Sequence, residues 1–364
     1  MTQMTYEPVM NLTRGDIVES IHFGAIAVVD NQNRLTAWWG NPDTITFLRS
    51  SAKPFQLMPF LENGGQEAYG LTLREIAIMC ASHSGTDAHK EVIQGIQRKT
   101  GVQEKDLLCG VHALSHKATV TAMQQRGEPL TSNRHNCSGK HTGMVAFARL
   151  LGLPYGLSDY PYIDRDHPIQ KQIVSTFADM CGLEPAQVHV GVDGCSAPNF
   201  AVPLRNAAYG FARLCDPQGL PEKRAEVCRT ITTAMMANPD MVGGPDSFDT
   251  HLMQALEGKV VCKGGAEGYQ AMGIMPGAIG PGSPALGVAL KVSDGDLGSH
   301  TPPGSEANGH ARPAISLEIL RQLGVIHDDQ LASLAGFGPG FTIENFRKIL
   351  VGQGYTCFTL CRDK

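Results

Sequence analysis

The chain has 364 residues, of which 42% are hydrophobic and 18% are charged, and its net charge is −5 at pH 7. This balance is typical of a globular protein with one large domain or two, and the absence of a basic block argues against a nucleic-acid or anionic-membrane surface. No apolar run reaches the roughly 18 residues that a membrane helix needs, and the N-terminus has no signal-peptide pattern. Ten cysteines are scattered without a framework spacing. We therefore expect reduced thiols in a cytoplasmic protein.

The first elements predict a hairpin that leads into a helix. Two β-rich segments, 21–29 and 34–39, flank an Asp/Asn-rich turn. The stretch 48–60 then changes abruptly from polar to apolar, as at the start of a buried helix. In it, Ser50 and Lys53 stand three residues apart, so on a helix they share one face. A serine hydroxyl needs a neighbouring base to become a nucleophile, and a lysine with a lowered pKa can be that base. Taken alone, the pair is also compatible with a purely structural role.

A second polar cluster follows the next predicted helix. Thr72 and Glu75 have the spacing of a capping box, and the helix that they open ends in Ala81-Ser82-His83-Ser84-Gly85. Polar residues directly after a hydrophobic element either carry chemistry or cap the helix. Further helices are predicted over 86–100, 116–127, 168–181, 203–214 and 221–237, with one or two over 310–335.

Two more polar stretches border regular elements, one before a helix and one after a strand. The loop 131–143 is rich in Cys, His and Lys and opens onto a helix over 144–151, whose free N–H groups can bind an anion. The stretch 188–199 runs from a strand into a glycine-rich turn that carries Asp193 and Cys195. Repetition of this pattern favours a shared pocket.

The remaining strands predict one antiparallel sheet. Segment 259–272 forms a strand, a glycine turn and a second strand, and 286–292 forms a third. The Pro/Gly/Ser-rich segment 296–309 is predicted to be a surface loop. We expect an α+β or α/β protein in which residues 1–364 form a single catalytic unit, β-rich over about 15–50 and 255–350 and mostly helical over about 51–254.

The order of the polar groups points to an acyl-transfer site. A helix-borne Ser-x-x-Lys, a second serine and a strand Lys-x-Gly, here Lys263-Gly264-Gly265, are the arrangement of the serine β-lactamases and penicillin-binding proteins. In those proteins the strand lies beside the nucleophile, and its backbone N–H helps to hold the oxyanion. The usual hydroxyl residue is missing after Lys263.

Five longer motifs carry a more specific resemblance. They are Ser50-Ser51-Ala52-Lys53-Pro54-Phe55-Gln56, Cys80-Ala81-Ser82-His83-Ser84-Gly85, Asn136-Cys137-Ser138-Gly139-Lys140-His141-Thr142-Gly143-Met144, Asp193-Gly194-Cys195 and Lys263-x-Gly-Ala-Glu-Gly. Over about residues 15–350 the chain resembles the rhizobial-type (class 3) L-asparaginases. The resemblance implies a serine β-lactamase-like (penicillin-binding-protein-like) fold, with an antiparallel sheet flanked by helices plus a helical region. It also implies hydrolysis of L-asparagine to L-aspartate and ammonia, and a homodimer.

The resemblance also implies roles for individual residues. Ser50 and Lys53 form one reactive pair, and Ser82 and Lys263 form a second pair that meets it in one pocket. We favour Ser50 as the attacking group, with Ser82 relaying protons or holding the tetrahedral intermediate. Repulsion between two ammonium groups would lower the pKa of one lysine and leave it able to act as a base. Asp193 could bind the α-amino group of the substrate, with Arg49 and His135 on the polar rim.

A zinc ion is implied as well, held by Cys137, Lys140 and Cys195 with water as the fourth ligand. From the residues alone, His135 or His141 would be the choice for the third protein ligand, and buried inert cysteines are the alternative. A lysine ligand is unusual because its amine must first lose a proton. We expect the zinc to position the substrate's carboxylate rather than to generate the nucleophile. The other cysteines are expected to be structural.

Two alternatives to an L-asparaginase remain open at this stage. One is a β-lactamase-like or peptidase-like acyl transferase for larger substrates. The missing hydroxyl residue after Lys263 and the lack of a secretion signal argue against it. The other is a non-catalytic, zinc-dependent ligand-binding protein on the same scaffold. The presence of all four Ser and Lys candidates argues against that alternative.

Overall fold

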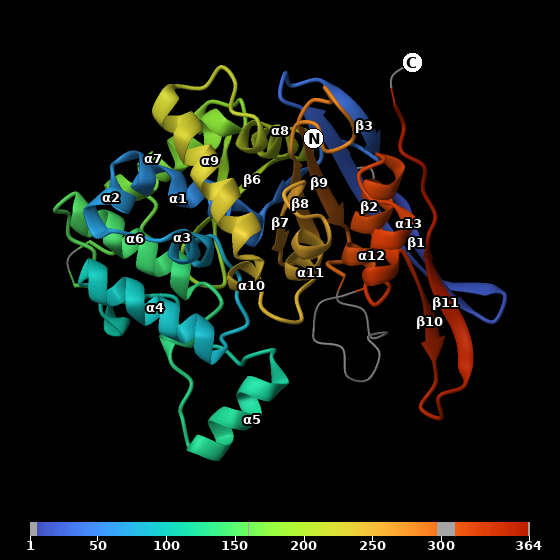
Figure 1. Ribbon diagram of the computed structural model, residues 1–364, viewed down its shortest axis with the longest axis horizontal. Helices are drawn as coiled ribbons and strands as arrows, with labels where there is room; N and C mark the ends of the chain where they lie inside the picture. The colour runs from blue at the N-terminus through green and yellow to red at the C-terminus, as the bar shows by residue number, and fades with distance from the viewer. Residues whose placement is uncertain (1–5, 159, 297–309, 363–364) are drawn as a thin grey trace. The chain divides into compact units, whose positions relative to one another are not determined.

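The computed structural model describes residues 6–158, 160–296 and 310–362 (Figure 1). The chain divides into two compact units. Unit 1 comprises Met1–Leu48, Val202–Asp216 and His251–Lys364, and unit 2 comprises Arg49–Ala201 and Pro217–Thr250. The two regions predicted to be β-rich thus fall mostly in unit 1, and most of the predicted helical region falls in unit 2. Except for Asp296, the surface loop predicted over 296–309 lies outside the described residues.

Unit 1 is built on an antiparallel sheet with the strand order β10-β11-β1-β2-β9-β8-β7, in which β3 pairs with β2. The strands are β1 (Glu7–Arg14), β2 (Ile17–Asp30), β3 (Leu35–Trp39), β7 (Val260–Gly265), β8 (Tyr269–Ile274), β9 (Leu286–Val292), β10 (Gly340–Glu344) and β11 (Leu350–Thr356). The predicted hairpin is β2–β3, and the three strands predicted for one antiparallel sheet are β7, β8 and β9. Both predictions are confirmed.

Helices cover this sheet where its strands are most apolar. Residues 24–30 of β2 are all buried, a pattern that requires cover on both faces. Helix α8 (Leu204–Cys215) packs on β2, β8 and β9, while α12 (Ala311–Gln322) packs on β1, β8, β9 and β11. A shorter helix, α13 (Asp328–Ser333), follows, and β4 (Ile45–Phe47) precedes the break to unit 2. The predicted antiparallel sheet flanked by helices is therefore confirmed.

Unit 2 is mostly helical. Its elements are η1 (Arg49–Ala52), α1 (Lys53–Glu62), α2 (Gly65–Tyr69), α3 (Leu73–Met79), α4 (Asp87–Thr100), η2 (Glu104–Asp106), α5 (Lys117–Arg126), η3 (Ser132–Arg134), α6 (Ser138–Leu150), α7 (Pro168–Met180), η4 (Pro185–Gln187), β5 (His189–Val192), β6 (Pro198–Pro203), α9 (Glu222–Ala237) and α10 (Pro239–Val242). Helix α11 (Phe248–Ala255) runs from unit 2 into unit 1. Helix α1 is buried from Lys53 to Leu61 and packs against α6, α7 and α9. The predicted helical region is confirmed.

Two predicted helix starts were wrong. Ser50 lies on the 3₁₀ turn η1, and the α-helix begins only at Lys53. Helix α6 begins at Ser138 instead of Met144, so Cys137 is its N-cap residue and Lys140 lies in its first turn. The earlier start is possible because Gly139 allows α6 to approach α3 closely: a Cβ at Gly139 would lie 2.0 Å from the carbonyl oxygen of Ile78. By contrast, the capping box of Thr72 and Glu75 forms as predicted.

A search of the described residues for a membrane-spanning helix, one both long and apolar enough to cross a bilayer, finds none.

Candidate active site

Lys53 lies at the centre of the candidate site in unit 2. Its side chain is 1% exposed. The Nζ atom donates hydrogen bonds to the carbonyl oxygen of Ala81, to Ser82 Oγ at 2.9 Å and to the carbonyl oxygen of Asn136 at 3.3 Å. An ammonium group has three donors, so these three acceptors satisfy the charged state completely. In a neutral amine, the two carbonyls can each accept one N–H, which directs the nitrogen lone pair at Ser82.

The Ser82 hydroxyl is positioned by the backbone on both sides of it. The N–H of Ser82 donates to the carbonyl oxygen of Val242 at 2.9 Å, and the preceding carbonyl, that of Ala81, accepts from Lys53. The structure therefore brings Lys53 together with Ser82. Among the described residues no hydrogen bond joins Lys53 to Ser50, although helical spacing had suggested that pairing. Ser50 lies on the 3₁₀ turn that precedes α1, so the i, i+3 geometry of an α-helix does not apply to this pair.

The turn that carries Ser50 is held by residues far along the chain. Arg49 has a φ of 52°, in the left-handed region that few non-glycine residues adopt. Its backbone N–H donates to Asn199 Oδ1 at 3.1 Å, and its Nε donates to Asp193 Oδ1 at 2.7 Å. Burial alone would raise the pKa of Asp193, but the positive charges of Lys140 and Arg49 outweigh burial and lower it. Arg49 and Asp193, two of the three residues predicted to bind substrate, are thus paired directly, and Ser50 follows Arg49 on the same turn. Their role in substrate binding stays a prediction.

The three predicted metal ligands also come together. Lys140 Nζ lies 3.0 Å from Cys195 Sγ, and all three side chains are buried. Contact with Cys195, together with Lys53 and Lys140, lowers the pKa of Cys137 well below its usual value although burial opposes it. Burial would lower the pKa of Lys140, but the sulfurs of Cys195 and Cys137 outweigh burial and raise it. The surroundings therefore favour the thiolate form of Cys137 and the ammonium form of Lys140.

Whether this cluster fits zinc can be judged from its donors. In the parts of the chain that the structure describes, no group of three or more His, Cys, Asp or Glu side chains could hold a metal ion. A zinc site here therefore depends on Lys140, which must lose its proton on binding. Two thiols supply the soft ligands that zinc prefers. Next to them, His141 Nε2 is buried without a hydrogen-bond partner, while His141 Nδ1 lies 2.6 Å from the hydroxyl of Tyr162. The donor set fits a zinc ion.

His135, which the sequence analysis predicted for the polar rim of the substrate site, lies beside the cluster of Cys137, Lys140 and Cys195. Its Nδ1 accepts the N–H of Cys137 at 2.9 Å, so the proton of the neutral ring is on Nε2. Burial, with Lys53 and Lys140 nearby, lowers its pKa to about 4, although Cys195 opposes that shift. A neutral His135 can therefore donate one hydrogen bond through Nε2.

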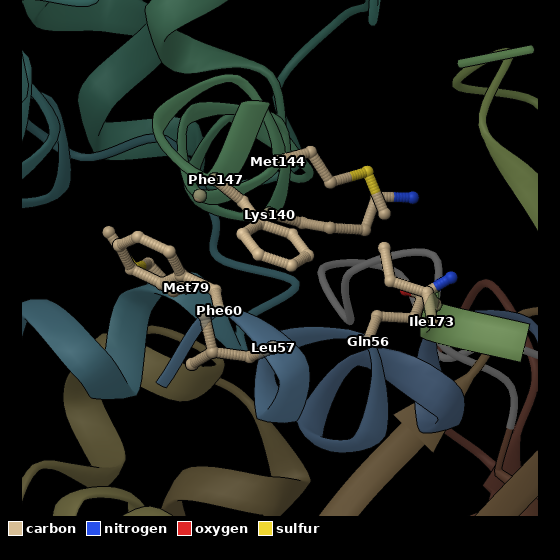
Figure 2. A pocket seen from close by; sticks show the side chains of 9 residues that line it. Gln56, Leu57, Phe60, Met79, Lys140, Met144, Phe147 and Ile173 are labelled. Carbon is tan, nitrogen blue, oxygen red and sulfur yellow. The ribbon is translucent and has the colours of Figure 1, made fainter. Parts of the chain in front are cut away.

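A cavity under Lys140 is too small for a substrate. It has a volume of about 10 Å³, room for about one water molecule. Figure 2 shows the Lys140 stem on α6 with the apolar lining residues around it, among them Phe60, Met79, Met144 and Phe147. The cavity therefore belongs to the apolar support of the cluster, since the stem packs there and only the amine reaches Cys195.

Lys263 lies in unit 1, on the edge strand β7. Its side chain is 1% exposed, and its Nζ donates to the carbonyl oxygen of Gly264 at 2.7 Å. Its pairing with Ser82 in one pocket stays a prediction.

Several residues of the site were not found by sequence reasoning. The carbonyl groups of Ala81 and Asn136 carry no side-chain signal, and Asn199 acts on η1 from a distant strand. His83 stands inside one of the quoted motifs and Arg134 in the loop 131–143, yet no role was assigned to either.

Comparisons with known proteins identify the family of the chain. The family model described as L-asparaginase II matches residues 10–353. Among solved structures, the chain is similar to a probable glutaminase from Bacillus subtilis in complex with 6-diazo-5-oxo-L-norleucine. The two sequences are 9% identical, the TM-score is 0.38, and the match covers 83% of this chain and 84% of that chain. It is also similar to a β-lactamase from Mycobacterium bovis, with 12% identity, a TM-score of 0.41, and coverage of 83% and 95%. Such TM-scores indicate a distant likeness that does not extend to the site. No curated protein matches the chain. Because the family match spans nearly the whole sequence, the chain belongs to the L-asparaginase II family and is an amidohydrolase.

Proposed function

We propose that the chain hydrolyses the side-chain amide of L-asparagine to L-aspartate and ammonia through a serine ester, with Lys53 as the base. The hydrogen bond of 2.9 Å between Lys53 Nζ and Ser82 Oγ carries the proposal, because it gives a buried lysine a hydroxyl with which to exchange a proton. Family membership supports the substrate, since L-asparagine is the substrate that the family's name states.

The steps follow from the placement of the hydroxyl groups. Neutral Lys53 removes the Ser50 proton, and Ser50 Oγ attacks the amide carbon to form a tetrahedral intermediate. Ser82 passes the proton from Lys53 to the departing nitrogen, so that ammonia leaves and an ester remains on Ser50. Water then attacks the ester, with Lys53 accepting its proton and returning it to Ser50. The contact between Ser82 and Lys53 supports the relay. Catalytic hydrogen bonds are often absent before substrate binds, so the proposal does not require a hydrogen bond between Lys53 and Ser50 in the free protein.

Substrate binding is assigned to the group around Arg49. Asp193 is a carboxylate with a lowered pKa, and it suits the α-amino group of an amino acid. Arg49, which donates to Asp193, and neutral His135 suit the α-carboxylate. Lys263 is assigned as the second lysine, partner to Ser82, as the family resemblance implies.

Zinc is proposed as a resident ion held by Cys137, Lys140 and Cys195. When bound, it supplies a positive centre that can orient a carboxylate. The protein's own part is to keep both thiols and the amine buried and close together, with the Lys140 stem packed in the core. The proton of the Lys140 ammonium is released on binding, so metal affinity falls at low pH.

We also propose a homodimer and a cytoplasmic location. On β2, Ile21 and Phe23 lie two residues apart on one face and are each at least 40% exposed, which supports contact with a second copy. No disulfide bond joins any of the ten cysteines, all of which lie within the described residues, in keeping with a reducing compartment.

The function is tested by ammonia release from L-asparagine, L-glutamine and a β-lactam on one zinc-assayed sample. We expect turnover of L-asparagine. Turnover of the β-lactam alone, or ligand binding without turnover, would contradict the proposal.

The roles of the two serines are tested by rapid quenching and mass measurement of the Ser50→Ala and Ser82→Ala variants. We expect an ester on Ser50 in the wild type and none in Ser50→Ala. In Ser82→Ala the ester should form far more slowly, because Ser82 passes the proton to the departing nitrogen. Turnover should fall by several orders of magnitude in both variants. An ester mapped to Ser82 would reverse the two roles.

A further inference from the structure

His83, next to Ser82 in the chain, has both ring nitrogens committed to buried partners. Its Nδ1 accepts the N–H of Gly85 at 3.1 Å, so the proton is on Nε2, which lies 2.9 Å from Ser138 Oγ and donates to it. The Ser138 hydroxyl then donates to the carbonyl oxygen of Asn133 at 3.0 Å. The ring is 1% exposed, and burial, with His89 and Lys53 nearby, lowers its pKa well below the usual value. His83 is thus neutral, and neither of its nitrogens is available as a base for Ser82.

These bonds join the two segments that hold Lys53. Two of the Lys53 acceptors, the Ala81 carbonyl and Ser82 Oγ, belong to the segment 81–85. The third, the Asn136 carbonyl, belongs to the segment 133–138. The chain of hydrogen bonds from Gly85 through His83 and Ser138 to Asn133 runs from the first segment to the second.

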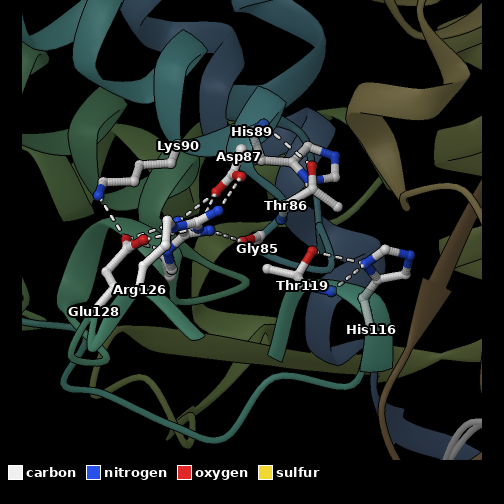
Figure 3. Close-up of polar contacts among 10 residues, drawn as sticks. Gly85, Thr86, Asp87, His89, Lys90, His116, Thr119, Arg126 and Glu128 are labelled. Carbon is white, nitrogen blue, oxygen red and sulfur yellow. Dashed lines mark hydrogen bonds and ion pairs between the residues drawn. The ribbon is translucent and has the colours of Figure 1, made fainter. Parts of the chain in front are cut away.

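Gly85 is held from its other side as well. It has a φ of +71°, and a Cβ there would lie 2.6 Å from the carbonyl oxygen of Arg134, so no other residue fits. Its own carbonyl oxygen accepts from Arg134 Nη1 at 2.7 Å. Figure 3 shows Gly85 beside a cluster in which Asp87 and Glu128 both accept hydrogen bonds from Arg126. The same two carboxylates also accept from Arg134. Both backbone polar groups of Gly85 are therefore fixed, one by Arg134 and one by His83.

We propose that His83 is a positioning residue, which keeps segments 81–85 and 133–138 at the spacing that places all three acceptors around the Lys53 amine. The inference rests on the proposed function, in which Lys53 and Ser82 exchange a proton. A displacement of one segment by a fraction of an ångström would lengthen the Lys53–Ser82 hydrogen bond without changing the residues that bind substrate.

The test compares His83→Asn with a matched control, His167→Asn. Asparagine can still accept the Gly85 N–H at the position of Nδ1, but it cannot reach Ser138. His167 is 0% exposed and has the same two bonds at the start of α7: its Nδ1 accepts the N–H of Ile169 at 3.2 Å, and its Nε2 lies 2.8 Å from the carbonyl oxygen of Pro154. The two variants therefore lose equivalent hydrogen bonds, but only the His83 variant loses a bond next to the segments that hold Lys53.

We expect His83→Asn to lower kcat by about 10²-fold, the cost typical of a misplaced catalytic group, with KM close to that of the wild type. His167→Asn should lose similar thermal stability and keep its kcat. Ser138→Ala removes the same bond from its other end and should also lower kcat, and the double variant should be no worse than His83→Asn alone. If His83→Asn does not fold, Ser138→Ala and His167→Asn provide the same comparison.

Equal kcat values in the His83 or Ser138 variant and in the His167 control, at matched loss of stability, would overturn the proposal. So would a rise in KM with kcat unchanged. These results are distinct from a failure of the proposed function, which would show as an inactive wild type or a fully active Ser82→Ala.

Discussion

At the scale of single residues, the surroundings of the Lys53 amine explain how a serine can be activated without a histidine. Two peptide carbonyls accept from it in a buried site, so the amine cannot rotate freely. When it is neutral, its lone pair is aimed at Ser82 before substrate arrives, and no reorganisation is needed during the reaction. Lys140 differs, because the thiols beside it raise its pKa and favour its charged form. Lys53 and Lys140 therefore suit different chemistry.

The metal assignment leads to a prediction about Cys195. Cys195→Ala should lose zinc and raise KM by about 10- to 100-fold, as expected when a contact to a charged group worth about 1.5–3 kcal/mol is lost, while kcat at saturating substrate is retained. Metal analysis and steady-state kinetics on one sample measure both effects. Cys109→Ala is the control, since burial, with Cys137 and Cys195 nearby, raises the pKa of the Cys109 thiol to about 12 and keeps it protonated. An equal fall in kcat would show that zinc takes part in the chemical step.

A second prediction at this scale concerns acid stability. Burial lowers the pKa of His89 from 6.5 to about 4, although its hydrogen bond to the Asp240 carbonyl opposes the shift. Between these values the unfolded chain binds a proton that the folded chain does not. The stability contributed by neutral His89 is therefore complete above about pH 6.5 and is lost as the pH falls toward 4, by up to about 3 kcal/mol. Urea unfolding at pH 7 and pH 5 should show a smaller loss for His89→Asn than for the wild type. Equal losses would mean that His89 does not contribute.

At the scale of elements, the contact between α3 and α6 sets the position of the metal-binding turn. Gly139→Ala should destabilise the protein by about 1–3 kcal/mol, because the new methyl group meets the backbone carbonyl of Ile78, which cannot move away as a side chain can. Gly143→Ala, one turn later on α6, is the control. There a Cβ makes only ordinary contacts, at 3.5 Å, with Leu57 and Met79, and helix propensity favours alanine by about 1 kcal/mol. Urea unfolding measures both variants. Equal effects would show that the α3–α6 contact can adjust.

Local signals were enough to predict most elements. The capping box located the start of α3, and apolar segments with turn residues between them located the strands β2, β3, β7, β8 and β9. The elements that were missed depend on distant partners. Strand β1 pairs with β11 at the other end of the chain, and η1 depends on Asn199, which is 150 residues from Arg49.

The same limit applies to the site. Lys53 and Ser82 could be picked out by residue type and position, whereas Cys195 was assigned only through the family resemblance. The groups that orient Lys53 are backbone carbonyls of Ala81 and Asn136, which any sequence possesses. His83 has a distinctive side chain, but only its hydrogen bonds show that it is structural support rather than a base.

At the scale of the whole molecule, the predicted catalytic residues are distributed over both units. The segments that bear Ser50, Lys53, Ser82 and the three zinc ligands all belong to unit 2, whereas Lys263 belongs to unit 1. Each unit therefore contains a residue that the proposed reaction requires, whereas the three proposed zinc ligands all belong to unit 2. Metal binding and turnover should consequently respond differently to a change in unit 1.

This separation gives a prediction for Lys263→Met, which keeps the aliphatic stem but removes the amine. We expect kcat to fall by about 10²–10⁴-fold, the range for loss of one acid–base group, while zinc content stays at the wild-type value. Lys259→Met, adjacent to the same strand β7, is the control and should keep both properties, since no role falls to Lys259. Metal analysis and ammonia release measure the two readouts separately. Loss of zinc together with activity would show that unit 1 supports the metal site. An unchanged kcat would remove Lys263 from the reaction and leave Lys53 as the base for both serines.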